Sequence, residues 1–309
     1  MNEDPNNVLY VYGFTLAGPA PEGAGAGTAE AEVSAGLLSG GIDEPHPPFL
    51  RRNGSLAGVL SRVSRSEFCG PTGEKNLQDL TWLAARACRH QAVLEQVMRL
   101  GPVLPARFGT LFSSPASLES FLRKHEAAIA RFLDWVRGQE EWAVKGFLDR
   151  ERAEAAWVAR RRPETPGAPG SSPGVAYLQE QGLRLEASRA LDDRLTEACH
   201  GLLNELNPLA SGIVPRPILA RQTPGAGREM VLNWALLLPA AAAAVFRGRI
   251  EGANAEQNPG GLAFEVSGPW PPYSFCPVLE PEPPNPNPNP AVPVRLQAGL
   301  APGAAIAEE

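Results

Sequence analysis

Several side chains that can exchange protons lie close together at the start of the second half of the chain. Glu140, Glu141, Lys145 and Asp149 fall within one ten-residue stretch. Because side chains alternate in direction along a strand, Glu141, Lys145 and Asp149 would share one face. Two carboxylates can serve as general acid and general base. A solvated or salt-bridged sheet face has the same pattern, and it is the interpretation that we favour.

The histidines and cysteines provide few other candidates for catalytic or metal-binding residues. His125 lies on the apolar side of an expected helix, where a packed histidine is far more common than a catalytic base. Cys199 and His200 are helix neighbours that point in different directions, so they cannot form a nucleophile–base pair. The cysteines lack the Cys-x-x-Cys spacing of zinc sites, and the chain has no phosphate-binding loop. We therefore expect no catalytic residues, no metal and no cofactor.

The segment LPARFGTLF, Leu104–Phe112, is more specific than ordinary core sequence. It places a single arginine, Arg107, between a proline turn and a turn at Phe108 and Gly109. A guanidinium group has five donors in a fixed fork, which suits carbonyls and carboxylates at a domain junction. We expect Arg107 to be structural or to bind a partner, with Glu141 or Asp149 as its acceptor.

A second specific segment, GPWPPYSF, spans Gly268–Phe275 and directly follows an expected strand. Its prolines cannot continue a sheet ladder. The segment can fold back over its own domain, or it can present Trp270, Tyr273 and Phe275 to a partner as rigid aromatic anchors. Both interpretations stay open from the sequence.

Hydrophobic periodicity predicts the elements that position these segments in the first half. Val8–Phe14 is expected to be a strand buried on both faces, and Ser55–Val63 a second strand. A helix is expected from Asn76, capped by Asn76 and Asp79. Its apolar face would consist of Leu77, Leu80, Ala84, Ala87, Leu94 and Met98. A further helix begins at Ser114 and Pro115, with an apolar side formed by Leu118, Phe121, Leu122, Ile129, Phe132, Leu133 and Val136.

The second half shows elements in the order β-α-β-β-α-β. The expected strands are 141–148, 212–221, 229–238 and 262–267, and the expected helices are 177–206 and 239–253. A ferredoxin-like unit has this order, with helices on one face of an antiparallel sheet. We therefore predict an α+β protein with an N-terminal mixed α+β domain over residues 1–138 and a C-terminal ferredoxin-like βαββαβ domain over residues 139–276.

Three stretches lack apolar periodicity and are rich in Gly, Pro and Ala. They are residues 15–53, residues 160–174 and the tail 277–309, which contains PEPPNPNPNP. Such segments bury too little apolar surface to offset the entropy of ordering the backbone. We expect a long loop, a flexible loop and a disordered tail.

Charge and hydropathy exclude two classes of partner. The net charge of −6 argues against a nucleic-acid binder that depends on a basic patch. The longest apolar run, about residues 234–246, contains Pro239 and is shorter than the roughly 20 residues that span a bilayer. The N-terminal MNEDPNN has no secretory-signal pattern. We expect a cytoplasmic protein that does not insert into membranes.

The segments VLYVYGF, LPARFGTLF, EEWAVKGFL and GPWPPYSF occur in this order between residues 8 and 276. Together they resemble the gas vesicle accessory proteins of the F/L type (GvpF/GvpL). The resemblance implies two α+β domains, the second similar to a ferredoxin fold. It also implies a non-enzymatic role in which the protein binds the hydrophobic gas vesicle shell subunit and other accessory proteins, to chaperone or nucleate wall formation. Arg107, Phe108, Gly109, Glu141, Lys145, Trp270, Tyr273 and Phe275 are the candidate binding or structural residues.

Two other classes of function stay open. One is a generic protein-interaction adaptor. The other, which we favour less, is a small-molecule enzyme that uses Glu141, Lys145, Arg107 or His125. An enzyme should have a concave pocket with convergent polar groups, whereas an adaptor should have an apolar groove or an open sheet edge.

Overall fold

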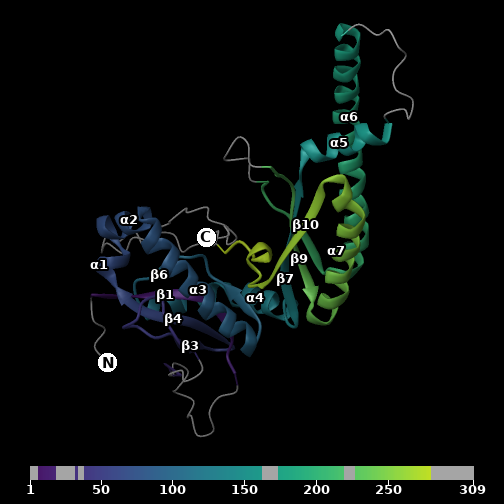
Figure 1. Cartoon of the computed structure of the whole chain (residues 1–309). Helices are drawn as coiled ribbons and strands as arrows, with labels where there is room; N and C mark the ends of the chain where they lie inside the picture. The colour runs from purple at the N-terminus through teal and green to yellow at the C-terminus, as the bar shows by residue number, and fades with distance from the viewer. Residues whose placement is uncertain (1–5, 19–31, 34–37, 162–172, 219–226, 280–309) are drawn as a thin grey trace. The chain divides into compact units, whose positions relative to one another are not determined.

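A computed structural model of the 309-residue chain describes residues 6–18, 32–33, 38–161, 173–218 and 227–279. These residues form an α+β protein with two antiparallel sheets, as the sequence predicts (Figure 1). The chain divides into two compact units. The first contains residues 1–137 together with the residues from Cys276 onward, and the second contains residues 138–275. Among the described residues, none of the helices is long and apolar enough to cross a membrane.

The sheet of the first unit has the strand order β2-β3-β4-β1-β5, and β6 also pairs with β1. Its strands are β1 (Asn7–Leu16), β2 (Glu32–Val33), β3 (Phe49–Asn53), β4 (Leu56–Ser64), β5 (Val103–Pro105) and β6 (Leu111–Phe112). Its helices are α1 (Arg65–Phe68), α2 (Gly70–Gln78), α3 (Leu80–Leu100) and α4 (Pro115–Trp135).

Strand β1 is buried on both faces, which confirms the prediction from its sequence. The two faces meet different helices. On one side the ring of Tyr12 stacks on His90 of α3, with centroids 5.5 Å apart. On the other side Phe14 stacks on Phe121 of α4 at 5.7 Å. A strand covered twice needs apolar or hydrogen-bonded side chains at every position, and this explains the continuous VLYVY run.

Helix α4 begins as predicted, because the side chain of Ser114 accepts a hydrogen bond from the backbone of Ser117. The predicted start of the preceding helix is wrong, and of its predicted apolar face only Leu94 is buried in the observed helix. Asp79 is its N-cap, whereas Asn76 lies inside α2 and donates to the carbonyl oxygen of Glu67. The buried side of α3 consists of Leu83, His90, Val93, Leu94 and Val97. Leu80 is 76% exposed. Larger side chains bury more apolar area than the alanines of the predicted face, so they face the sheet.

The prediction of one long loop over residues 15–53 is also wrong. Strands β2 and β3 lie within this stretch, and β3 pairs with β4 along its whole length. Leu38, Ile42 and Phe49 are buried. The backbone hydrogen bonds of β3 are made to the neighbouring strand β4. The amino-acid composition of the segment itself does not indicate this pairing.

The second unit contains a four-stranded sheet with the order β10-β7-β9-β8, in which all neighbours are antiparallel. Its elements are β7 (Gln139–Leu148), α5 (Arg150–Arg161), α6 (Pro173–Leu206), β8 (Gly212–Pro215), β9 (Glu229–Pro239), α7 (Ala243–Gln257) and β10 (Leu262–Trp270). The core lies between the sheet and the helices, and Trp142, Val144 and Leu148 of β7 point into it as predicted.

Helix α5 was not expected from the sequence. Its residues are mostly charged, and it contributes only Ala153 and Trp157 to the buried side chains. Because α5 reaches Arg161 and α6 starts at Pro173, the predicted loop 160–174 is shorter at both ends. Residues 162–172 lie outside the described part of the chain, as does most of the predicted tail, residues 280–309.

Candidate functional site

The Gly268–Phe275 segment folds back on the sheet of the second unit, where Glu141 holds it. The side chain of Glu141 is 2% exposed. Its carboxylate accepts hydrogen bonds from the backbone nitrogen of Ser274 at 2.9 Å and from Ser274 Oγ at 2.7 Å. Burial raises the pKa of Glu141, and the two bonds from Ser274 partly oppose this. Both carboxylate oxygens are therefore engaged in holding the turn Tyr273–Phe275.

The three aromatic residues that the sequence suggested as anchors lie near the hydrogen bonds between Glu141 and Ser274. Trp270 is the register partner of Glu141 across β10 and β7, and its Nε1 donates to Ser267 Oγ at 3.2 Å. Trp270, Tyr273 and Phe275 are all half-buried, so each rests on the unit and keeps an exposed part. The structure thus brings together four of the residues that the sequence singled out.

A close approach of the backbone explains the glycine at the start of this segment. Gly268 has a φ of 140°, and a Cβ there would lie 2.9 Å from the carbonyl oxygen of Glu141. A larger residue would push the segment away from β7. Lys145 lies farther along β7, where its register partners are Glu265 on β10 and Asn233 on β9.

Arg107 occupies a tight turn between β5 and β6 at the edge of β1. The backbone nitrogen and Oγ1 of Thr110 both donate to the carbonyl oxygen of Arg107, at 3.1 and 2.7 Å. Gly109 provides the positive φ of 80° that the turn needs. The side chain of Arg107 is exposed, and its guanidinium has no hydrogen bond or ion pair with any residue that the structure describes.

Arg107 lies in the first unit and Glu141 and Asp149 lie in the second, so the bond expected between them stays a prediction. The carboxylate of Glu141 is engaged with Ser274, and that of Asp149 accepts from the backbone nitrogen of Arg152 at 3.0 Å. Both donors lie within the second unit, and only the carboxylate of Glu141 is buried. Arg107 stays a candidate for contact with a partner.

Two buried residues that the sequence analysis did not single out lie beneath this turn. Tyr10 of β1 is fully buried and His90 of α3 is 3% exposed, and Tyr10 Oη lies 2.7 Å from His90 Nδ1. Burial lowers the pKa of His90 to about 4, which keeps the imidazole neutral at pH 7. The spacing of His90 from Leu83 and Val97, seven residues on either side, was a signal that could have placed it on the buried face.

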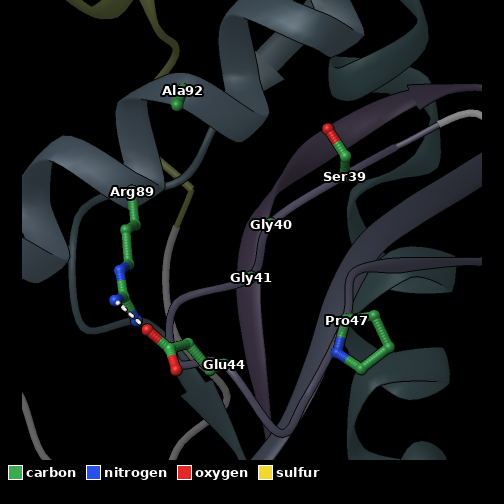
Figure 2. A pocket seen from close by; sticks show the side chains of 7 residues that line it. All are labelled: Ser39, Gly40, Gly41, Glu44, Pro47, Arg89 and Ala92. Carbon is green, nitrogen blue, oxygen red and sulfur yellow. Dashed lines mark hydrogen bonds and ion pairs between the residues drawn. The ribbon is translucent and has the colours of Figure 1, made fainter.

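The first unit also contains a pocket of about 310 Å³ between α3 and the segment that precedes β3 (Figure 2). Its lining residues are Ser39, Gly40, Gly41, Glu44, Pro47, Arg89 and Ala92. Arg89 Nη2 and Glu44 Oε1 form an ion pair at 3.1 Å (Figure 2). Ser39 Oγ donates to Gln96 Oε1 at 3.2 Å. This lining holds no histidine, cysteine or lysine, and none of the predicted site residues belongs to it.

Metal-binding and histidine chemistry find no support in the described residues. Within them, no three His, Cys, Asp or Glu side chains gather as a metal site. His125 packs its ring against Phe121, with centroids 4.7 Å apart. This is the packed histidine that the sequence favoured.

Known proteins resemble the chain over most of its length. Residues 8–277 match the protein family described as gas vesicle synthesis protein GvpL/GvpF. Gas vesicle protein L of Streptomyces sp. (strain CB03234) is 31% identical over 239 residues, which cover 76% of this chain and 85% of the relative. The crystal structure of GvpF from Anabaena sp. PCC7120 is similar in fold, with a TM-score of 0.60, 18% identity, and coverage of 89% of this chain and 98% of that one. GvpF from Microcystis aeruginosa has a TM-score of 0.59, 19% identity, and coverage of 88% and 99%.

Proposed function

The chain belongs to the GvpL/GvpF family of gas vesicle proteins and has a role in gas vesicle formation, and we propose that it acts there as a non-enzymatic accessory protein that binds the hydrophobic shell subunit. The observation that carries this proposal is the Gly268–Phe275 segment. Buried Glu141 holds it, and it keeps three aromatic side chains half exposed. Rigid aromatic side chains provide large contact area at a low entropy cost.

The physical need for such a protein is clear. A shell subunit that has not yet assembled exposes apolar surface, which promotes aggregation. A protein of net charge −6 stays soluble while it covers that surface, so it could chaperone the subunit or nucleate the wall. We place this activity in the cytoplasm, at the growing gas vesicle, with other accessory proteins as further partners.

We also infer that the second unit has the ferredoxin-like arrangement. The strand order β10-β7-β9-β8 and the element order, which is β-α-β-β-α-β apart from the additional helix α5 after β7, support this inference. We accordingly propose residues 1–138 and 139–276 as the two domains, with 277–309 as the tail.

A pull-down with the full chain and purified shell subunit tests the binding. We expect wild type to retain the subunit and a triple alanine variant of Trp270, Tyr273 and Phe275 to lose it with little change in thermal midpoint. Trp135→Ala is the matched control, because Trp135 is an aromatic residue that is 41% exposed on α4. If wild type fails to retain subunit that is kept soluble, the proposal is wrong. If the triple variant unfolds, the three aromatics belong to the core.

A further inference from the structure

The turn that carries Arg107 is attached to the core at both ends. The backbone nitrogen of Ala106 donates to the carbonyl oxygen of Tyr12 at 2.8 Å, and that of Val11 donates to the carbonyl oxygen of Thr110 at 2.9 Å. The two bonds from Thr110 to Arg107 close the turn internally. The exposed side chain of Arg107 therefore extends from a backbone segment that has little conformational freedom.

The same turn rests on the buried pair Tyr10 and His90. The backbone nitrogen of Gly109 donates a long hydrogen bond, 3.5 Å, to Tyr10 Oη. The ring of Phe108 meets the rings of Tyr10 and His90 edge to face, at 6.2 and 5.9 Å between centroids. The hydrogen bond between Tyr10 Oη and His90 Nδ1 completes this support, and which of the two groups donates it depends on the tautomer of His90.

We propose that the turn 106–110 is a preformed contact element that presents the Arg107 guanidinium to a carboxylate of the shell subunit, and that Tyr10 and His90 are its positioning residues. This inference rests on the proposed function and adds the chemistry of the contact. A guanidinium fork binds a carboxylate through two parallel hydrogen bonds, provided that its approach angle is fixed. A rigid turn removes part of the entropy cost of that contact.

Two other arginines of the first unit have their guanidinium groups engaged. Arg89 pairs with Glu44, and Arg137 pairs with Asp134. Arg107 combines a guanidinium that has no partner among the described residues with a turn that is anchored from inside the unit, and a carboxylate of the partner would engage that guanidinium.

The test uses the full chain with single substitutions and two measurements: affinity for purified shell subunit at two salt concentrations, and amide hydrogen exchange of Gly109 and Thr110. We expect Arg107→Ala to weaken binding about fivefold or more at low salt and less at high salt, because salt screens the ion pair. Arg107→Lys should restore part of the loss. Arg123→Ala removes another exposed arginine, on α4, and should leave affinity unchanged.

Tyr10→Phe tests the positioning residues, and Tyr12→Phe is its matched control. Both tyrosines lie fully buried on β1, but Tyr12 Oη bonds Ser61 and the backbone of Ile42, away from the turn. We expect Tyr10→Phe to speed exchange at Gly109 and Thr110 about fivefold and to weaken binding, and Tyr12→Phe to change neither.

The outcomes separate the two proposals. If wild type does not bind the shell subunit, the proposed function and the carboxylate contact both fail. If wild type binds but Arg107→Ala binds equally well, the contact alone is refuted. If Tyr10→Phe leaves exchange at Gly109 and Thr110 at the wild-type rate, the positioning role is refuted whatever the affinity.

Discussion

Acidification should destabilise the first unit through His90. In the folded chain burial lowers the pKa of this imidazole from 6.5 to about 4, so the folded state keeps it neutral where the unfolded chain takes up a proton. The unfolded state therefore binds more protons between pH 6.5 and pH 4. Stability that is present above pH 6.5 is lost as the pH falls through this range.

The magnitude follows from the two pKa values. Each pKa unit corresponds to about 1.4 kcal/mol, so at pH 4, where half of the folded molecules are protonated, His90 should cost about 3 kcal/mol relative to pH 7. That is a large part of the stability of a typical domain, which is about 5 to 15 kcal/mol. Because His90 is 3% exposed, solvent does little to screen this effect.

The assay compares wild type with His90→Asn across pH 7 to pH 4. The asparagine oxygen can accept from Tyr10 Oη but does not titrate. Hydrogen exchange of the β1 amides in a urea series gives the free energy of unfolding of this unit. We expect His90→Asn to be less stable at pH 7 and the difference to shrink by about 3 kcal/mol by pH 4. His200→Asn, at an exposed position of α6, should keep the wild-type dependence. Parallel curves for wild type and His90→Asn would refute the reasoning.

Three further predictions concern single hydrogen-bonded side chains. Glu141→Gln should destabilise the second unit by about 1 to 3 kcal/mol in urea unfolding, because an amide cannot accept both bonds from Ser274. Since burial raises the pKa of Glu141, wild type should lose stability as the pH rises through that pKa. If Glu141→Gln loses stability over the same pH range, Glu141 is not the group that titrates. Asp79→Ala should cost about 1 kcal/mol through loss of the α3 N-cap, measured by thermal denaturation, whereas an unchanged midpoint would rule out the cap. Asn254→Ala should expose the backbone nitrogen and oxygen of Phe264 on β10, which Asn254 binds at 2.7 and 2.8 Å. Sedimentation should then show self-association through this edge, and a monomer at all concentrations would count against it.

The main strands and helices and the family could be predicted from the sequence, because both depend on local patterns, whereas β2, β3 and α5 were missed. The continuous apolar run Val8–Phe14 required a strand covered on two sides, and α3 and α4 cover it. The Ser114-Pro115 pair and the apolar spacing after it defined α4 and its buried side. Segments such as GPWPPYSF could be recognised as motifs from the sequence alone, before their contacts were known.

The polar contacts of the candidate site depend on residues that are distant in sequence, and only the tertiary structure decided them. Glu141 and Ser274 are 133 residues apart, and Tyr10 and His90 are 80 apart. Periodicity predicts which side of an element is buried, but the partner of a buried carboxylate or imidazole depends on strand register and helix placement. For the same reason the sequence did not indicate that Ser274 donates to Glu141 or that the backbone of Arg152 donates to Asp149. Hydrophobic patterning is a property of a segment, whereas hydrogen-bond satisfaction is a property of the packed whole.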